Sequence, residues 1–290
     1  MKVLITGSRG QLGWELQRGV PAGVDLIALD RDALDISNGT AVSRLVDQLR
    51  PDAIVNAAAY TAVDRAESEP ALAHAVNADG AAHLARAARA VGAHLVQVST
   101  DFVFDGRGSR PYPVDAAPAP LGVYGASKLQ GEREVREYLG ERALILRTAW
   151  VYSVHGNNFV KTMLRLMRER DELRVVADQV GTPTWACDLA AAIWQGLAHG
   201  ITGTHHWTDA GVASWYDFAV AIAEESLALG LLDRQVPIRP IRSEEFPTAA
   251  TRPAYSVLDK SSTWAALGMT ASHWRQSLRR MLSELKTSGS

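Results

Sequence analysis

A tyrosine and a lysine stand four residues apart, at Tyr124 and Lys128. In a helix this spacing places both side chains on one face. A phenol can protonate a carbonyl oxygen while hydride adds to the carbon, and a nearby ammonium favours that chemistry. At about 4 Å and an effective dielectric near 20, the gross interaction is about 4 kcal/mol, roughly what a tyrosine pKa near 10 needs to approach 7. The pair predicts carbonyl reduction, with Tyr124 as proton donor and Lys128 as its partner.

A second group of polar residues follows the apolar run that ends near residue 98, namely Ser99, Thr100 and Asp101. A hydroxyl at the end of a strand could hydrogen-bond to the same carbonyl oxygen as Tyr124 and stabilise the charge that develops on it. We assign this role to Thr100 and expect Ser99 to face the core. Without Tyr124 and Lys128 nearby, Ser-Thr-Asp would be an ordinary turn or helix N-cap.

Three glycines, Gly7, Gly10 and Gly13, follow the first apolar run with the spacing G-x-x-G-x-x-G. Glycine allows a tight turn and a close approach of backbone to phosphate, and a helix N-terminus offers free N–H groups. Because the glycines stand at the first strand–helix junction, they predict a dinucleotide site rather than a plain turn.

The end of the second strand carries two residues that point to different cofactors. Asp30 could accept hydrogen bonds from the adenosine ribose, which favours NADH. Arg31 could bind a 2′-phosphate, which favours NADPH. The sequence therefore leaves NADPH and NADH as alternatives. Asp35 and Ile36 are weaker candidates for contact with adenine.

Short aliphatic runs alternate with helical stretches over the first half of the chain. Strands are expected at 3–6, 26–29, 53–56, 95–99 and 143–147, and helices at 12–19, 40–48, 70–91 and 124–139. This alternation predicts βαβ units and an α/β fold of Rossmann type, a doubly wound parallel sheet that binds ligands outside the carboxyl ends of its strands.

The alternation becomes irregular after about residue 150, which predicts a smaller C-terminal substrate-binding lobe. Helices are expected at 159–170, 214–229 and near 273–285, and a proline-punctuated loop or short strand at 236–253. The dinucleotide-binding domain is expected to take 1–150 with roughly 172–185 and 203–208, the lobe roughly 151–171 and 209–286, and a flexible tail 287–290.

Composition excludes several classes of function. The 290 residues are 47% hydrophobic and carry a net charge of −2 with the charges dispersed, which is unlike a nucleic-acid-binding or membrane-surface protein. No apolar run approaches the roughly 18 residues that span a bilayer, and no leader precedes the first strand. The single cysteine, Cys187, cannot form an intramolecular disulfide. We therefore expect a cytoplasmic protein without nucleic-acid or membrane partners.

Taken in order, these segments resemble the extended short-chain dehydrogenase/reductase superfamily, and within it the dTDP-4-dehydrorhamnose reductase family. The matching segments span most of the chain and include 10–16, 50–64, 66–70, 99–106, 120–128, 147–152, 156–159, 178–183 and 252–256. That family reduces the 4-keto group of dTDP-4-dehydro-L-rhamnose to give dTDP-L-rhamnose, a polysaccharide precursor. The resemblance implies the same NAD(P)H-dependent reaction and a dTDP-sugar substrate.

The resemblance also implies which residues bind. Cofactor contacts would come from Gly7, Gly10, Gln11, Leu12, Gly13, Asp30, Arg31, Asp35, Ile36, Ala59, Tyr60, Thr61, Val98, Tyr124 and Lys128. Substrate contacts would come from Thr100, Asp101, Tyr124, Trp150, Asn158 and Arg252. Asp101 and Trp150 would contact the deoxysugar, and Asn158 and Arg252 the diphosphate. Trp150 could instead be a core residue and Arg252 could bind helix-end carbonyls.

The chain departs from the family pattern in two places. Some members form a magnesium-dependent dimer built on glutamates, and Glu15 and Glu284 match two of these. Cys187 stands at the third position, and a neutral thiol is a poor ligand for magnesium. Asp188 could replace it only if the backbone turned it inward, so we expect no metal site, while a homodimer is still compatible with the sequence. The second departure is Phe102, where relatives often have tyrosine.

Two rival functions are compatible with the fold. One is another NDP-sugar reductase, an epimerase or a dehydratase, although Phe102 stands where a dehydratase would need a further acid–base residue. The other is a non-catalytic dinucleotide-binding regulatory subunit. The presence of Thr100, Tyr124 and Lys128 together favours an enzyme.

Overall fold

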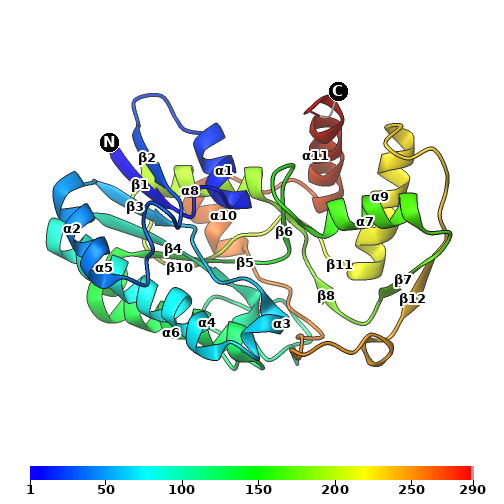
Figure 1. The fold of residues 1–290 in the computed structure, drawn as a ribbon, viewed down its shortest axis with the longest axis horizontal. Coiled ribbons are helices and arrows are strands. Elements are labelled where there is room, and N and C mark those ends of the chain that lie inside the picture. The colour runs from blue at the N-terminus through cyan, green and yellow to red at the C-terminus, as the bar shows by residue number, and fades with distance from the viewer. Residues whose placement is uncertain (289–290) are drawn as a thin grey trace.

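The computed structural model of the protein describes residues 1–288 and is built around a six-stranded sheet (Figure 1). Neighbouring strands follow the order β10-β5-β4-β3-β1-β2, and each pair is parallel. The strands are β1 (Lys2–Thr6), β2 (Asp25–Leu29), β3 (Ala53–Asn56), β4 (His94–Thr100), β5 (Leu144–Thr148) and β10 (Gly203–His206). The predicted Rossmann-type α/β fold is confirmed.

Helices cover both faces of the sheet (Figure 1). They are α1 (Gln11–Arg18) and α8 (Ala186–Ala198) on one face, and α2 (Gly39–Leu49), α5 (Gly80–Val91) and α6 (Val123–Leu139) on the other. Val3 and Ile5 of β1 pack towards the first group, while Leu4 between them packs towards the second. Burial on both faces explains why residues 3–5 of β1 and 53–55 of β3 are continuously apolar.

The order of the strands reverses at β1, which lies between β2 and β3. Ligands of such sheets bind outside the carboxyl ends of the strands at this reversal. The glycine loop that starts at Gly7 leaves β1 at that point, and α1 begins directly after it. The fold therefore brings the predicted cofactor loop to the expected edge of the sheet.

The predicted helix 70–91 consists of α4 (Pro70–His74), a π-helical turn (Ala75–Asp79) and α5. The turn lies where α6 crosses closely, because a Cβ atom on Gly131 would be 2.2 Å from the Asn77 carbonyl oxygen. The Asn77 side chain accepts from the Tyr60 amide (2.9 Å) and donates to the Tyr60 carbonyl (3.0 Å) and the Ser127 hydroxyl (3.0 Å). The widened turn thus joins two segments of the candidate site.

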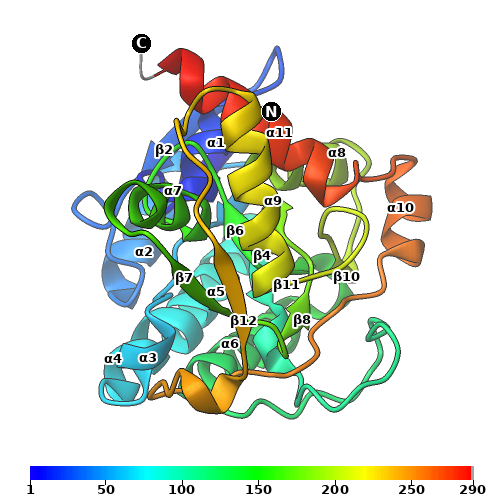
Figure 2. The ribbon, with the colours of Figure 1, turned by 90° about the vertical axis from the view of Figure 1, so that its right-hand side faces the viewer.

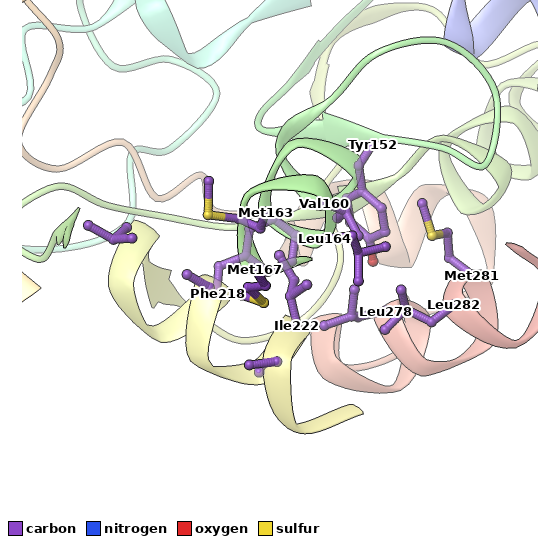
Figure 3. Packing of buried hydrophobic residues seen from close by; sticks show 14 of the residues in the cluster. Tyr152, Val160, Met163, Leu164, Met167, Phe218, Ile222, Leu278, Met281 and Leu282 are labelled. Carbon is purple, nitrogen blue, oxygen red and sulfur yellow. The ribbon is translucent and has the colours of Figure 1, made fainter. Parts of the chain in front are cut away.

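A smaller C-terminal lobe contains α7 (Phe159–Glu169), α9 (Trp215–Ala228) and α11 (Trp274–Ser288), together with the parallel pair β7 (Leu173–Val176) and β12 (Ile238–Ile241) (Figure 2). Its core is made by Met163 and Met167 of α7, Phe218 and Ile222 of α9, and Leu278 of α11 (Figure 3). The remaining short elements are α3 (Val63–Ala66), β6 (Val151–Tyr152), β8 (Val180–Gly181), β9 (Thr184–Trp185), β11 (Ala213–Ser214) and α10 (Ser261–Leu267).

Three segments pack or fold differently from what the expected boundaries suggest. Residues 172–185 were expected in the dinucleotide-binding domain, but β7 pairs with β12 and Leu173 packs in the lobe core. Leu267 of α10, expected in the lobe, packs instead in the cluster beneath β1 and β3. The tail expected from residue 287 is helical through Ser288, and residues 289–290 lie outside the described part of the chain. Within residues 1–288 there is no helix of the length and apolarity required to cross a membrane.

Candidate active site

The first turn of α6 places Tyr124 beside the end of β4. Gly125 makes this approach possible, because a Cβ atom there would be 2.2 Å from the Phe102 carbonyl oxygen. The Tyr124 hydroxyl is hydrogen-bonded to Thr100, and its ring meets the Phe102 ring edge-on at 5.5 Å. The structure therefore brings together the tyrosine and threonine that the sequence analysis assigned to one carbonyl oxygen.

The residues on either side of Thr100 face different surroundings. The Thr100 hydroxyl donates to Asp101 Oδ1 (3.0 Å) and accepts from the Phe102 amide (3.2 Å). Ser99 is buried and donates to Glu132 Oε1 at 2.6 Å, so the expectation that it faces the core is confirmed. Burial raises the pKa of Asp101 to about 6, against opposing hydrogen bonds from Ser256 and Thr100.

Burial also shifts the pKa values of Tyr124 and Lys128. It raises the pKa of Tyr124 to about 12, so the phenol is neutral at physiological pH. It lowers the pKa of Lys128 to about 8, although the Glu132 carboxylate acts in the opposite direction. Lys128 Nζ donates to the Val98 carbonyl oxygen at 2.7 Å. The expected fall in the Tyr124 pKa is wrong, because burial of the phenol outweighs the hydrogen bond with Thr100, and the Asp101 charge acts in the same direction as burial.

The glycine loop has the shape of a phosphate cradle. Gly7 has φ +73, and a Cβ atom on it would be 2.6 Å from the Ala58 amide nitrogen. A Cβ atom on Gly13 would be 2.2 Å from the Gly7 carbonyl oxygen. Gly10 begins α1 without a side-chain cap from the described residues. The loop therefore fits the diphosphate of a dinucleotide, which would bind at the helix N-terminus.

The cation next to Asp30 is Arg9 of the glycine loop. Arg9 Nε lies 2.6 Å from Asp30 Oδ2, and Arg9 Nη1 lies 2.8 Å from Asp32 Oδ2. Arg31 is directed instead to Asp35, at 3.7 Å. Arg9 was not predicted from the sequence, although its place inside the glycine motif was a usable signal. A 2′-phosphate near Asp30 would meet the Arg9 guanidinium.

Other predicted cofactor residues lie in well-defined contacts. Tyr60 is fixed through its backbone by Asn77, and its hydroxyl donates to Glu69 at 2.6 Å. Asp35 accepts from the Ser37 hydroxyl at 2.7 Å, which lowers its pKa. Ile36 is buried against Gly80, where a Cβ atom would be 2.7 Å from its side chain.

Trp150 has a strained backbone and a ring in close contact with two residues that are distant in the sequence. Its φ of +48 is uncommon for a bulky residue, and such strain persists only where the surroundings impose it. The ring stacks on Trp215 at 3.6 Å, and a Cβ atom on Gly181 would be 2.6 Å from ring atom Cε2. Trp215 and Gly181 were not predicted from the sequence, because only the folded chain brings them to Trp150.

Asn158 and Arg252, the predicted diphosphate contacts, have different partners. Asn158 caps α7 and donates from Nδ2 to Gln11 Oε1 at 2.9 Å, so it adjoins the glycine loop. Arg252 forms a two-contact ion pair with Asp64, at 2.8 and 3.1 Å. A diphosphate would have to compete with Asp64 for the Arg252 guanidinium.

The residues considered for magnesium are arranged around an arginine. Arg18 pairs with Glu15 at 2.9 Å and also with Glu284. Burial raises the pKa of Cys187, which keeps its thiol neutral. Asp188 binds Ser277 at 2.9 Å on α11. These residues do not fit magnesium, and residues 1–288 contain no group of three or more His, Cys, Asp or Glu side chains able to hold a metal ion.

Comparisons with known proteins agree with this geometry. The family model described as the RmlD substrate binding domain matches residues 1–287. The dTDP-4-dehydrorhamnose reductase of Escherichia coli K12 is 42% identical, covering 99% of both chains. The dTDP-4-dehydrorhamnose reductase structure from Clostridium acetobutylicum is 42% identical with a TM-score of 0.93, covering 99% of this chain and 100% of the other.

The dTDP-4-dehydrorhamnose reductase of Bacillus anthracis, solved in complex with NADP, is 41% identical with a TM-score of 0.92, and the match covers 98% of this chain and 99% of the other. These matches extend over the sheet and the C-terminal lobe alike. The chain belongs to the dTDP-4-dehydrorhamnose reductase family.

Proposed function

We propose that this chain is an oxidoreductase that reduces the 4-keto group of dTDP-4-dehydro-L-rhamnose to give dTDP-L-rhamnose, with NADPH or NADH as the reductant. The carrying observation is the hydrogen-bonded pair of Tyr124 and Thr100 at the end of β4, with Lys128 one helical turn away. The names of the relatives and the NADP bound in the Bacillus anthracis structure support the same reaction.

In this mechanism Tyr124 donates its phenolic proton to the sugar's 4-oxygen. Its burial keeps the phenol protonated, because the pKa is raised to about 12. The Thr100 hydroxyl, which donates to Asp101 in the free site, would turn its proton to the same oxygen and stabilise the charge that develops there. A reduced nicotinamide, when held by the glycine loop, would supply the hydride for the 4-carbon. The Lys128 ammonium, one turn further along α6, would offer positive charge to the phenolate that remains.

The binding residues are part of the proposal. The glycine loop with Gln11 and Leu12 would hold the diphosphate of the cofactor, and the residues from Ala59 to Thr61 would lie along it. Asp101 and the held ring of Trp150 would contact the deoxysugar. Asn158, next to the glycine loop, is better placed for the cofactor than we expected from the sequence.

We also propose that the two parts of the chain bind different ligands. The six-stranded sheet with its helices would bind the dinucleotide, and the lobe around α7, α9 and α11 would bind the dTDP-sugar.

A cytoplasmic location is supported by the free thiol of the single cysteine, Cys187. A homodimer without a bridging metal is compatible with the engagement of Glu15 and Glu284 by Arg18.

The test is cofactor oxidation with dTDP-4-dehydro-L-rhamnose, together with identification of the sugar product. Tyr124→Phe should lower turnover about 10²- to 10⁴-fold, because the general acid is lost, and leave NADPH affinity near normal, because the ring is kept. Unchanged turnover in this variant would reject the assigned role. Oxidation with a different NDP-sugar would favour the rival reductase. Cofactor binding without turnover of any sugar nucleotide would favour the regulatory subunit.

A further inference from the structure

A buried ion pair lies one helical turn beyond Lys128. Glu132 and Arg147 have side chains that are 0% and 2% exposed. Arg147 Nε donates to Glu132 Oε1 at 2.8 Å, and Arg147 Nη2 donates to Glu132 Oε2 at 2.7 Å. This two-contact geometry fixes the carboxylate in orientation as well as in position.

Further contacts tie the pair to four elements of the fold. Glu132 on α6 also accepts from Ser99 on β4 at 2.6 Å and from Arg136 at 3.1 Å. Arg147 on β5 donates to the Val114 carbonyl at 3.2 Å and contacts His206 Nε2 on β10 at 3.4 Å. The carboxylate is therefore a fixed point between the catalytic helix and the strand that carries Thr100.

The same carboxylate adjoins both parts of the candidate site. Tyr124, Lys128 and Glu132 occupy positions i, i+4 and i+8 of α6, so they form one stripe. Ser99, which Glu132 binds, directly precedes Thr100. Lys128 itself is hydrogen-bonded to a neutral carbonyl, that of Val98, rather than to a carboxylate. Glu132 is the carboxylate whose charge opposes the effect of burial on Lys128.

We propose that Glu132 is a positioning residue of the reductase site: its fixed carboxylate keeps Lys128 as an ammonium and anchors the end of β4 that presents Thr100. The inference rests on the proposed function for its catalytic meaning. A purely structural ion pair can be replaced by uncharged residues of similar size without loss of the fold. A carboxylate that sustains the charge of Lys128 cannot be replaced in this way.

The neighbouring groups leave Lys128 as the one that titrates in the alkaline range. The cations next to the Glu132 carboxylate are the guanidinium groups of Arg136 and Arg147. Burial lowers the pKa of His206 to about 4, and the pKa of Asp101 is raised to about 6, so both titrate on the acid side. Burial raises the pKa of Tyr124 to about 12. The alkaline limb of a pH profile therefore reports on Lys128, with its pKa at about 8.

The test uses the double variant Glu132→Gln with Arg147→Met, which leaves no unpaired buried charge and keeps an oxygen for Ser99. One turn of helix separates the lysine from the lost charge, so we expect the Lys128 pKa to fall by about one unit. The value of kcat/KM should then drop about fivefold at pH near 8 and less than about twofold near 6. An alkaline limb that stays in place would overturn the proposal.

The matched control is Glu225→Gln with Arg279→Met, which alters a second glutamate–arginine pair, at 2.7 Å, between α9 and α11. It should leave the pH profile unchanged. Nitrogen NMR of the lysine side chains, with the Lys128 signal identified from Lys128→Met, separates this inference from the proposed function. A lowered Lys128 titration midpoint supports the inference even without sugar turnover, and an unmoved midpoint rejects it even with normal turnover.

Discussion

Replacing Lys128 with methionine should abolish turnover and at the same time stabilise the protein. Lys128 is buried, and its pKa falls from the ordinary 10.5 to about 8. The folded chain therefore holds an ammonium in surroundings that disfavour the charge. Methionine has a similar length and carries no charge, so it fills the space without the penalty.

The magnitude follows from the change in pKa. A fall from 10.5 to about 8 corresponds to about 3 kcal/mol at neutral pH, since each unit is worth about 1.4 kcal/mol. The variant loses the hydrogen bond from Lys128 Nζ to the Val98 carbonyl, at 2.7 Å, and this loss offsets about 1 kcal/mol of the gain in stability. Lys128→Met should therefore be about 2 kcal/mol more stable than the wild type at pH near 7.

The pH dependence gives the sign of the effect. Below a pH of about 8, Lys128 is charged in the folded and the unfolded wild type, and the full burial penalty is present. Between about 8 and 10.5 the folded protein has released the proton while the unfolded chain still holds it, so wild-type stability rises with pH. Above 10.5 the lysine is neutral in both states and the penalty disappears.

Urea unfolding of both proteins, followed by tryptophan fluorescence at pH near 7 and near 10, measures this difference. The advantage of Lys128→Met should be largest at the lower pH and should shrink towards the higher one. Lower stability than the wild type at neutral pH, or an advantage that does not change with pH, would refute the reasoning. Turnover of the same samples shows whether the stabilised protein is inactive.

Three further substitutions test other parts of the site. Arg9→Ala should weaken NADPH binding about fivefold and leave NADH affinity unchanged, since an exposed charge pair contributes about 1 kcal/mol. Fluorescence titration with both cofactors measures this, and an equal loss of affinity for the two would contradict it. Gly13→Ala would bring a methyl group to 2.2 Å from the Gly7 carbonyl oxygen and should cost about 2 kcal/mol, and an unchanged Tm would disprove the clash. Trp215→Ala removes the ring stacked at 3.6 Å on Trp150 and should raise the KM for the sugar about tenfold; steady-state kinetics showing an unaltered KM would remove Trp150 from the sugar site.

Local sequence determined the parts of the fold that could be predicted. The first five strands are apolar on both faces, because helices cover both faces of the sheet, and each is bounded by glycine, proline or polar residues. The glycine motif was recognisable because its function requires backbone conformations and close approaches that a side chain would block. Each of these signals is carried by residues that lie within a few positions of one another in the sequence.

Long-range packing determined what could not be predicted. Helix α8 is buried on most of its circumference, including Leu189, Ala192, Ile193 and Gly196, so its sequence lacks the polar face that marks an amphipathic helix. Strand β7 is only four residues long and reaches its partner β12 across more than sixty residues of chain. Arg9 rather than Arg31 meets Asp30 because of the path of the glycine loop, which residue order does not reveal.

In the site, too, local sequence predicted some features, and others depend on the folded structure. Helical periodicity placed Tyr124 and Lys128 on one face correctly, and extending it by one more turn would have found Glu132. Periodicity carries no information on burial, however, and burial moves the pKa of Tyr124 up and that of Lys128 down. A spacing argument that considers only the attraction between the two groups therefore gets the direction of the tyrosine shift wrong. The Glu132 carboxylate, held by Arg147 and Ser99, is what the fold adds to oppose burial at Lys128.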